Sequence, residues 1–304
     1  GRRAYLPFTA WRGALMRRGL AIGVVLLGIS TALAADLPTQ RAGFKRALEV
    51  AETRPLSEFA AATRGQAGHP LAPYLDYVAL RRQLGQVDAD AVKQFLDRHP
   101  DLPVSPLLRS EALRALAKRG DWAGFRLLYA GSNDAALRCG DLLSRANAHP
   151  DAAWRDAGLA LWLSGASQPT LCDGVFEVLR RHGLLTSERL WQRIELAAAE
   201  HNLGLMRFLA RSLPAPDAAR VQSYASYLEG PIQAPTASWP ADARSRRIAV
   251  LGLNRLARRD PGAADALLAS LQGRLALEPA QRGEVLNQIA LWSAASYLPD
   301  SARH

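Results

Sequence analysis

The feature that most constrains the fold of this chain is the spacing of its apolar residues. They recur three or four positions apart over most of the sequence, and hardly any stretch alternates between apolar and polar residues as a half-buried strand would. In VKQFLDRHP, for example, Val92, Phe95 and Leu96 share one face of a helix. Short corners such as SLPAPD (212–217) and RRDPG (258–262) interrupt the pattern about every ten to twenty residues. The sequence therefore predicts many short helices.

Short helices joined by short corners cannot each bury an apolar face alone, whereas stacked helical hairpins can. We therefore expect an all-α fold, a right-handed α-superhelix built as a solenoid of helical hairpins. The repeats are degenerate and follow no strict consensus of about 34 residues, so an ordinary tetratricopeptide array is not indicated. The one long irregular stretch, GPIQAPTASWPAD at 230–242, is the best candidate for a change of direction.

Polar residues at the corners are suited to satisfy the free backbone groups of helix ends. An oxygen-bearing side chain before a helix accepts bonds from first-turn amides, and on this ground we expect caps at Asp88, Ser105, Asp121, Ser187 and Asp217. An imidazole at the other end meets the last carbonyls and the negative end of the helix dipole, which is the role expected of His99, His149, His182 and His201.

The first 34 residues have the order of a secretory leader. Met16-Arg17-Arg18 supplies a basic start, residues 19–29 form an apolar run, and Ala32-Leu33-Ala34 forms an A-x-A cleavage site. The apolar run is shorter than the roughly 18 to 20 residues that span a bilayer, so a cleaved signal peptide is favoured over a retained anchor. We therefore expect residues 1–34 to be removed and residues 35–304 to form one scaffold domain. The chain would contact the membrane only during export.

The chain has two cysteines, Cys139 and Cys172. In an oxidising compartment two such residues are expected to form one disulfide, which would tie the corner WLSGASQPTLCDGVF (162–176) to an earlier helix. Metal binding is the weaker alternative, because a structural zinc needs more ligands than these two thiols provide. Two buried free thiols remain a further alternative.

The remaining signals argue against several functional classes. Five arginines and no acid lie in residues 1–34, so removal of the leader would lower the net charge from +10 to about +5. A mature chain of this charge gives little indication of nucleic-acid binding. No H-E-x-x-H, G-x-S-x-G, P-loop or glycine-rich dinucleotide turn is present. We therefore assign no catalytic residue, no cofactor-binding residue, no cofactor and no metal ligand.

Tryptophan is the remaining candidate for ligand contact, because its ring can stack on a sugar. Most of these residues stand among apolar neighbours at helical spacing, where an aromatic that locks one hairpin to the next is favoured: Trp122, Trp154, Trp162 and Trp191. Trp239 lies in the irregular stretch instead, and it is the one tryptophan that we retain as a ligand candidate.

Three stretches together resemble one family, the soluble lytic murein transglycosylases. They are HPLAPYLDYVALRRQL (69–84), KRGDWAGFRLLY (118–129), and WLSGASQPTLCDGVF followed by GLLTSERLWQRI (183–194). The resemblance is to the α-helical N-terminal domain of that family and covers nearly all of residues 40–297. It implies a U-shaped, ring-forming superhelix with an internal disulfide, located in the periplasm, and peptidoglycan glycan strands as the partner.

The family's enzymes cleave the β-1,4 bond between N-acetylmuramic acid and N-acetylglucosamine and leave a 1,6-anhydro product. Their acid/base glutamate lies in a separate C-terminal lysozyme-like domain, within a Glu-Ser motif that this chain lacks. We therefore expect the N-terminal scaffold of such an enzyme, inactive alone and partnered by a missing catalytic domain. Gly140-Asp141 departs from the aromatic residues expected after the first cysteine. The alternative function is a free-standing periplasmic α-solenoid that binds proteins or cell-wall precursors without catalysis.

Overall fold

The computed structural model describes residues 37–86, 88–146 and 149–295. Within these ranges the chain forms fifteen α-helices, one short 3-10 turn and no strand, which confirms the all-α expectation. None of these helices is long and apolar enough to cross a membrane. The expected leader, residues 1–34, lies outside the described residues.

The helices are short and closely spaced along the chain. Their bounds are α1 (Leu37–Thr53), η1 (Leu56–Glu58), α2 (Phe59–Thr63), α3 (Ala72–Arg82), α4 (Ala89–Arg98), α5 (Ser105–Arg119), α6 (Trp122–Leu128), α7 (Ala135–Ser144), α8 (Ala152–Trp162), α9 (Cys172–Arg181), α10 (Ser187–Ala199), α11 (Leu203–Ala210), α12 (Ala215–Glu229), α13 (Ala243–Ala257), α14 (Pro261–Arg274) and α15 (Pro279–Ala295).

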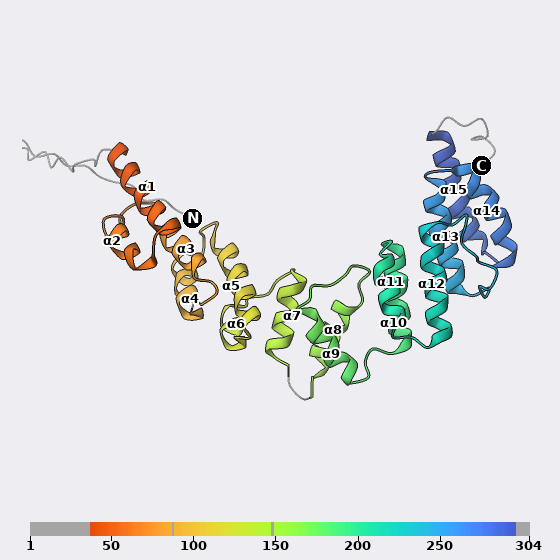
Figure 1. The fold of residues 1–304 in the computed structure, drawn as a ribbon, viewed down its shortest axis with the longest axis horizontal. Coiled ribbons are helices and arrows are strands. Elements are labelled where there is room, and N and C mark those ends of the chain that lie inside the picture. Colours follow the sequence, from red (N-terminus) through yellow and green to blue (C-terminus); the bar gives the residue numbers. More distant parts are fainter. Residues whose placement is uncertain (1–36, 87, 147–148, 296–304) are drawn as a thin grey trace, which may run out of the picture.

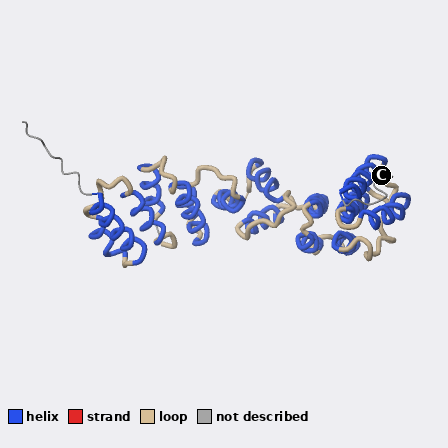
Figure 2. Tube along the Cα trace, turned by 90° about the horizontal axis from the view of Figure 1, so that it is seen from above, coloured by secondary structure: helices blue, strands red, loops and turns tan. Residues whose placement is uncertain are grey.

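The helices stack one after another along an arc, with α1 and α15 at its two separated ends (Figure 1). Viewed from above, the same array is narrow and almost straight, so the curvature lies mainly in one plane (Figure 2). Within the described part, helices with extensive mutual contacts are at most three places apart in chain order, as α10 and α13 are. The fold is therefore a superhelix held by near-neighbour packing, as the sequence predicts.

Most of the buried apolar residues form two clusters that meet at α7. The N-terminal cluster runs from Tyr77 to Leu137, and the C-terminal cluster runs from Cys139 to Ile289. Leu137 and Cys139 therefore lie on the same helix but belong to different clusters. Leu171, just before α9, is partly buried and packs against both clusters. The arc thus has a junction near its middle.

Side-chain caps begin many of the helices, although not always at the residue that the sequence suggests. Asp88 accepts a bond from the Asp90 amide and Asp121 one from the Gly124 amide, as expected. The other three expectations are wrong. Ser105 is already inside α5, where its Oγ bonds the carbonyl oxygen of His99. Thr186 caps α10 in place of Ser187, and Asp217 lies within the first turn of α12, paired with Arg220.

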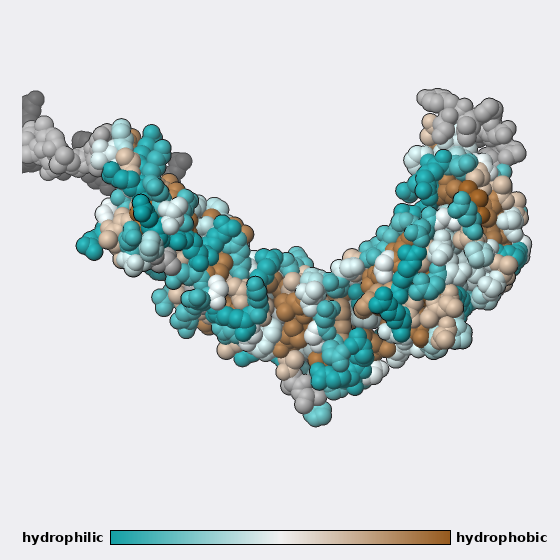
Figure 3. Space-filling model, in the orientation of Figure 1, coloured by the Kyte–Doolittle hydropathy of each residue, from teal (hydrophilic) through white to brown (hydrophobic). Residues whose placement is uncertain are grey.

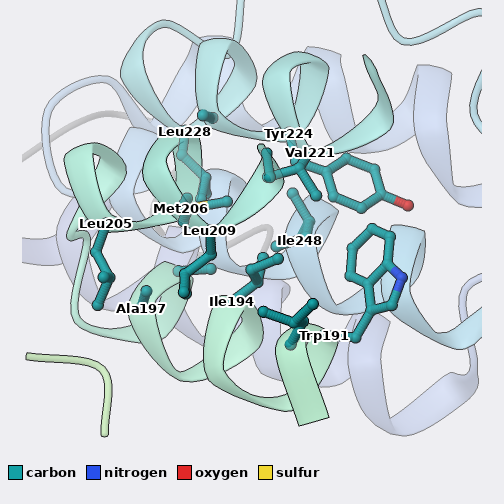
Figure 4. Packing of buried hydrophobic residues seen from close by; sticks show 14 of the residues in the cluster. Trp191, Ile194, Ala197, Leu205, Met206, Leu209, Val221, Tyr224, Leu228 and Ile248 are labelled. Atoms are coloured by element: carbon teal, nitrogen blue, oxygen red, sulfur yellow. The ribbon is translucent and has the colours of Figure 1, made fainter. Parts of the chain in front are cut away.

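The packing of α10 to α13 shows how the C-terminal cluster is filled. Side chains from the four helices point toward one another, among them Met206, Val221 and Ile248 (Figure 4). Tyr224 and Tyr227 of α12 are fully buried, and their hydroxyl groups bond Ser245 Oγ and the Ala249 carbonyl oxygen of α13. Burial raises the pKa of both phenols, and for Tyr224 it outweighs the opposite effect of Arg220.

Trp239 packs into this core, which favours a packing role for most of its ring, although the residue also lines a pocket of about 430 Å³ with Arg220 and Ser223. The residue is 6% exposed, and its ring lies edge-on to Tyr224 and Tyr227 at centroid distances of 4.6 and 5.0 Å. Its Nε1 donates to Ser223 Oγ at 2.8 Å. The irregular stretch 230–242 between α12 and α13 therefore folds back and covers the tyrosines of α12 with this ring.

We predict that Gly252→Ala destabilises the protein, because α13 approaches Tyr227 very closely at this glycine. A Cβ at position 252 would stand 2.2 Å from the Tyr227 ring, so the ring or the helix must move. The expected loss in free energy of unfolding is about 1–3 kcal/mol. The measurement is urea denaturation followed by circular dichroism.

The matched control is Gly283→Ala in α15, where nothing lies within 4 Å of an added Cβ. This substitution should raise the free energy of unfolding by up to about 1 kcal/mol, since alanine favours the helix. Equal effects of the two substitutions would contradict the close packing of α13 on α12.

Candidate functional site

The corner between α8 and α9 is cross-linked to α7. Cys139 of α7 and Cys172, the first residue of α9, form a disulfide with their Cα atoms 5.0 Å apart, and both residues are fully buried. The described residues contain no free cysteine. The disulfide therefore attaches the corner covalently to α7, the helix where the two hydrophobic clusters meet.

The packing around the disulfide explains the departure at Gly140-Asp141. A Cβ at position 140 would stand 2.6 Å from Phe125 of α6, so the Phe125 ring occupies the space that a larger residue would need. Asp141 turns outward and pairs with Arg145 one helical turn later, at 2.6 Å. The aromatic volume next to Cys139 is thus supplied by another helix.

The same corner is held on its other side by α10 and α11. Asn202, the N-cap of α11, accepts a bond from the Leu205 amide, and its Nδ2 donates to the Gly165 carbonyl oxygen and to Ser167 Oγ, both at 3.2 Å. A Cβ at position 165 would lie 2.4 Å from the Leu196 carbonyl oxygen. Glycine is therefore required where the corner touches α10.

A pocket of about 650 Å³ opens beside this corner. Its lining includes Trp162 from the end of α8, Phe176 from α9 and Arg193 from α10. Arg193 is 3% exposed, and its guanidinium carbon lies 4.2 Å from the centre of the Trp162 ring and 5.2 Å from that of Phe176. Phe208 of α11, 58% exposed, also lines the pocket.

Arg193 is the charged group most deeply buried in this lining. Its Nε donates to the Ser164 carbonyl oxygen at 3.3 Å, and among the described residues it forms no ion pair. Burial lowers the pKa of Arg193 to about 10, and the more distant charge of Asp173 only partly opposes this effect. The guanidinium therefore stays charged at neutral pH without a carboxylate bound to it.

Arg193 is a functional candidate that no motif marks, but the sequence does carry one signal for it. Arg193 falls on the apolar stripe of α10, between Leu190 and Ala197 at helical spacing, and all three side chains are buried. A charged residue on a buried face is uncommon without a partner or a role. The pocket itself is formed by helices α8 to α11 and could not be assembled from the sequence pattern alone.

A denser network of charged groups surrounds Trp191, which lies on α10 as Arg193 does. The guanidinium carbons of Arg220 and Arg244 lie 5.1 and 4.7 Å from the centre of its ring. Burial lowers the pKa of both arginines, but bonds to carboxylates outweigh it and leave each pKa raised. The carboxylates belong to Asp217, Asp242, Glu188 and Glu195, at 2.6 to 3.1 Å. The network joins α10, α12 and α13.

Three carboxyl groups of the described residues have a shifted pKa: Asp121, Asp134 and Asp217. Where the pKa of a carboxyl group shifts, it shifts downward. The Gly124 amide and Arg119 do this to Asp121, and Arg220 does it to Asp217. For Asp134 burial works in the opposite sense but is outweighed by bonds from the α7 amides and Arg114. A general acid needs a raised pKa. The described residues also hold no group of three or more potential metal ligands.

The expected structural histidines and tryptophans lie mostly where the sequence places them. His99 and His182 are the C-caps of α4 and α9, and His201 directly follows the C-cap of α10. His149 is the exception, since it lies two residues before Asp151, the N-cap of α8. Trp154, Trp162 and Trp191 are buried at 3% exposure and Trp122 packs against the N-terminal cluster, which supports their role as packing residues.

We predict that reduction of the Cys139–Cys172 disulfide lowers the free energy of unfolding by about 3–4 kcal/mol, because the cross-link restricts a loop in the unfolded chain. The two cysteines are 33 positions apart. Thermal melts with and without dithiothreitol measure the effect. A Cys139→Ser/Cys172→Ser variant is the control and should not respond to reductant. Alkylation of both thiols in unreduced, exported protein would contradict the link.

We also predict that Asn202→Asp lowers the free energy of unfolding by about 1–3 kcal/mol. Aspartate keeps the cap of α11 but places an oxygen against the Gly165 carbonyl oxygen, which cannot donate, so that only the Ser167 hydroxyl could turn to bond it. The control is the reverse exchange Asp151→Asn, at a cap that bonds the Trp154 amide. It should be nearly neutral. Equal urea midpoints for the two variants would show that the corner bonds contribute nothing.

Several known proteins are similar to this chain over most of its length. No family model matches the chain. The soluble lytic murein transglycosylase of Escherichia coli (strain K12) is 30% identical over 282 residues, which cover 90% of this chain. The protein of the same name from Salmonella typhimurium is 33% identical over 203 residues, or 65% of this chain. These matches cover 43% and 31% of the two relatives, so the chain spans less than half of their length.

Solved structures give the same result for the fold. The crystal structure of the 70-kDa soluble lytic transglycosylase from Escherichia coli matches with a TM-score of 0.78 at 26% identity, covering 88% of this chain and 44% of that one. An inactive mutant of the lytic transglycosylase Slt from Pseudomonas aeruginosa matches with a TM-score of 0.69 at 30% identity, covering 85% and 42%. The chain is therefore homologous to the soluble lytic murein transglycosylases and shares their all-α superhelical fold over the part that it matches.

Proposed function

We propose that this chain is the helical scaffold of a soluble lytic transglycosylase. The whole enzyme would cleave the β-1,4 bond between N-acetylmuramic acid and N-acetylglucosamine in peptidoglycan and leave 1,6-anhydro products. The observation that carries the proposal is the 30% identity over nine-tenths of the chain to a soluble lytic murein transglycosylase. The likeness in fold to the solved lytic transglycosylases supports it independently.

In this proposal the chain does not carry the catalytic carboxyl group. Cleavage of a glycosidic bond needs a proton donor with a raised pKa held against the leaving oxygen. The carboxyl groups of this chain whose pKa values shift are lowered by amides and arginines that hold the charged form. The acid/base glutamate would therefore lie in a lysozyme-like domain beyond the 43% of the relative that this chain matches.

In this proposal the superhelix positions the catalytic domain and binds the glycan strand. The face of the arc seen in Figure 3 is mostly hydrophilic, with apolar patches near its middle and in its C-terminal arm. Of the net charge of +10, five positive charges belong to residues 1–34, so residues 35–304 carry about +5. A cationic surface of this kind would attract an anionic cell wall, and added salt would weaken that attraction.

Location follows from the same proposal. Residues 1–34 would direct export and be cleaved after Ala34, which would place the mature chain in the periplasm. An oxidising compartment of this kind is where a structural disulfide such as Cys139–Cys172 persists.

We predict that the purified chain binds isolated sacculi in a salt-sensitive way and releases no anhydro-muropeptides. The measurement is incubation with peptidoglycan at low and high salt, followed by chromatography and mass spectrometry of the soluble fraction. The product of the complete gene, assayed in parallel, should release anhydro products.

Two outcomes would contradict this division of labour. Anhydro products above background from the chain alone would place a catalytic carboxyl group within residues 35–304. An inactive product of the complete gene would favour the free-standing periplasmic α-solenoid that binds without catalysis.

A further inference from the structure

The pocket beside the α8–α9 corner contains a buried cation that has no counter-ion in the part of the chain that the structure describes. Arg193 is 3% exposed, it donates a hydrogen bond to a backbone carbonyl oxygen, and its guanidinium lies over Trp162. A buried charge is normally paired, because loss of hydration is costly. The planar guanidinium has further N–H groups in a fork that matches the two oxygens of one anion.

Two more polar atoms of the same lining have no hydrogen-bond partner among the described residues. They are Trp162 Nε1, a donor, and Gln168 Oε1, an acceptor. Unsatisfied buried groups are rare in native structures, and two of them beside an arginine without a counter-ion mark a place that a ligand would complete. Such a ligand would offer an anion to the arginine and at least one N–H group to the glutamine.

The rim of the pocket selects among anions. Asp173 and Glu177 line it as well, and Glu177 is paired with Arg180. Arg180 also lines the pocket and offsets the charge of Glu177, so the carboxylate of Asp173 remains to repel a doubly charged phosphate more strongly than a singly charged carboxylate. Both side chains can also accept bonds from amide N–H groups. Apolar surface from Leu205 and the exposed ring of Phe208 would contact a small aliphatic side chain.

A carboxylate next to an amide and a small apolar side chain is the end of a peptide chain. We propose that the pocket formed by α8 to α11 binds the terminal carboxylate of a short peptide, with the guanidinium of Arg193 as its anchor. The peptide amide faces the acceptors of the rim, and the side chain of the last residue packs toward Phe208.

The test is isothermal titration calorimetry of the full chain with four probes. N-acetyl-D-alanyl-D-alanine and its L,L isomer carry the carboxylate, the C-terminal amide of the D,D peptide lacks it, and inorganic phosphate is an anion without a peptide. The choice of D-alanine rests on the proposed function, because peptidoglycan carries short peptides that end in this residue. We expect saturable binding of the D,D peptide and binding of its amide that is about tenfold weaker or more.

Variants at Gly204 give a matched pair that should fold normally. Gly204 lines the pocket on the exposed side of α11, and an added Cβ there meets only Asn202 Oδ1, at 3.9 Å. Gly204→Phe should obstruct the pocket and reduce affinity about tenfold or more, whereas Gly204→Ala should leave it unchanged. Arg193→Lys keeps the charge but loses the fork, and it should also weaken binding. Circular dichroism melts verify that each variant is folded.

The outcomes separate this proposal from the proposed function. Equal affinity for the peptide acid and its amide, full affinity in Gly204→Phe, binding of phosphate alone, or no saturable binding would overturn the pocket. The release of anhydro products by the complete gene product would be unaffected by any of these results. Binding of the L,L isomer as tightly as the D,D isomer would support a peptide-carboxylate site without a link to peptidoglycan.

Discussion

The junction at α7 is the constraint on which the shape of the whole arc depends. In a fold where each helix packs on its near neighbours, the direction of each arm is set locally and every angular error is carried outward to the ends. Leu137 and Cys139 of α7 belong to the two different clusters, and Leu171 packs against both. The Cys139–Cys172 disulfide ties the next hairpin to this helix. One covalent bond therefore acts where the two arms of the arc meet.

Polar contacts extend the same control into the C-terminal arm. Asn202 bonds the corner from α11, and the arginines around Trp191 link α10 to α12 and α13. Exposed ion pairs taken singly contribute little to stability. Here Arg244 reaches both Glu188 and Glu195 while its guanidinium lies over the Trp191 ring, so its geometry is fixed by three partners. The long connection 230–242 needs such support, because it leaves α12 and α13 without a tight corner.

The sequence was sufficient for whatever depends on local periodicity and insufficient for whatever depends on the return of a distant segment. The spacing of apolar residues and the corners predicted the helices. The secretory leader, which implies an oxidising compartment, together with two cysteines predicted the disulfide. The burial of Trp239 could not be predicted, because an irregular backbone does not imply an exposed side chain and the stretch folds back so that its ring covers Tyr224. Thr186 caps α10 instead of Ser187, because both side chains carry a hydroxyl group and the sequence does not show at which of the two the helix begins. The Arg193 pocket needs four helices, and no local pattern brings them together.

The short reach of the contacts also determines how such a chain can assemble. Helices that pack on near neighbours close only short loops, so contact order is low and structure can grow outward from any hairpin. The two cysteines, 33 positions apart, come together once α7, α8 and α9 have docked. Neither arm has to be finished first. The disulfide can therefore form as soon as these three helices have packed correctly. The remaining helices can then pack onto either side of this cross-linked unit.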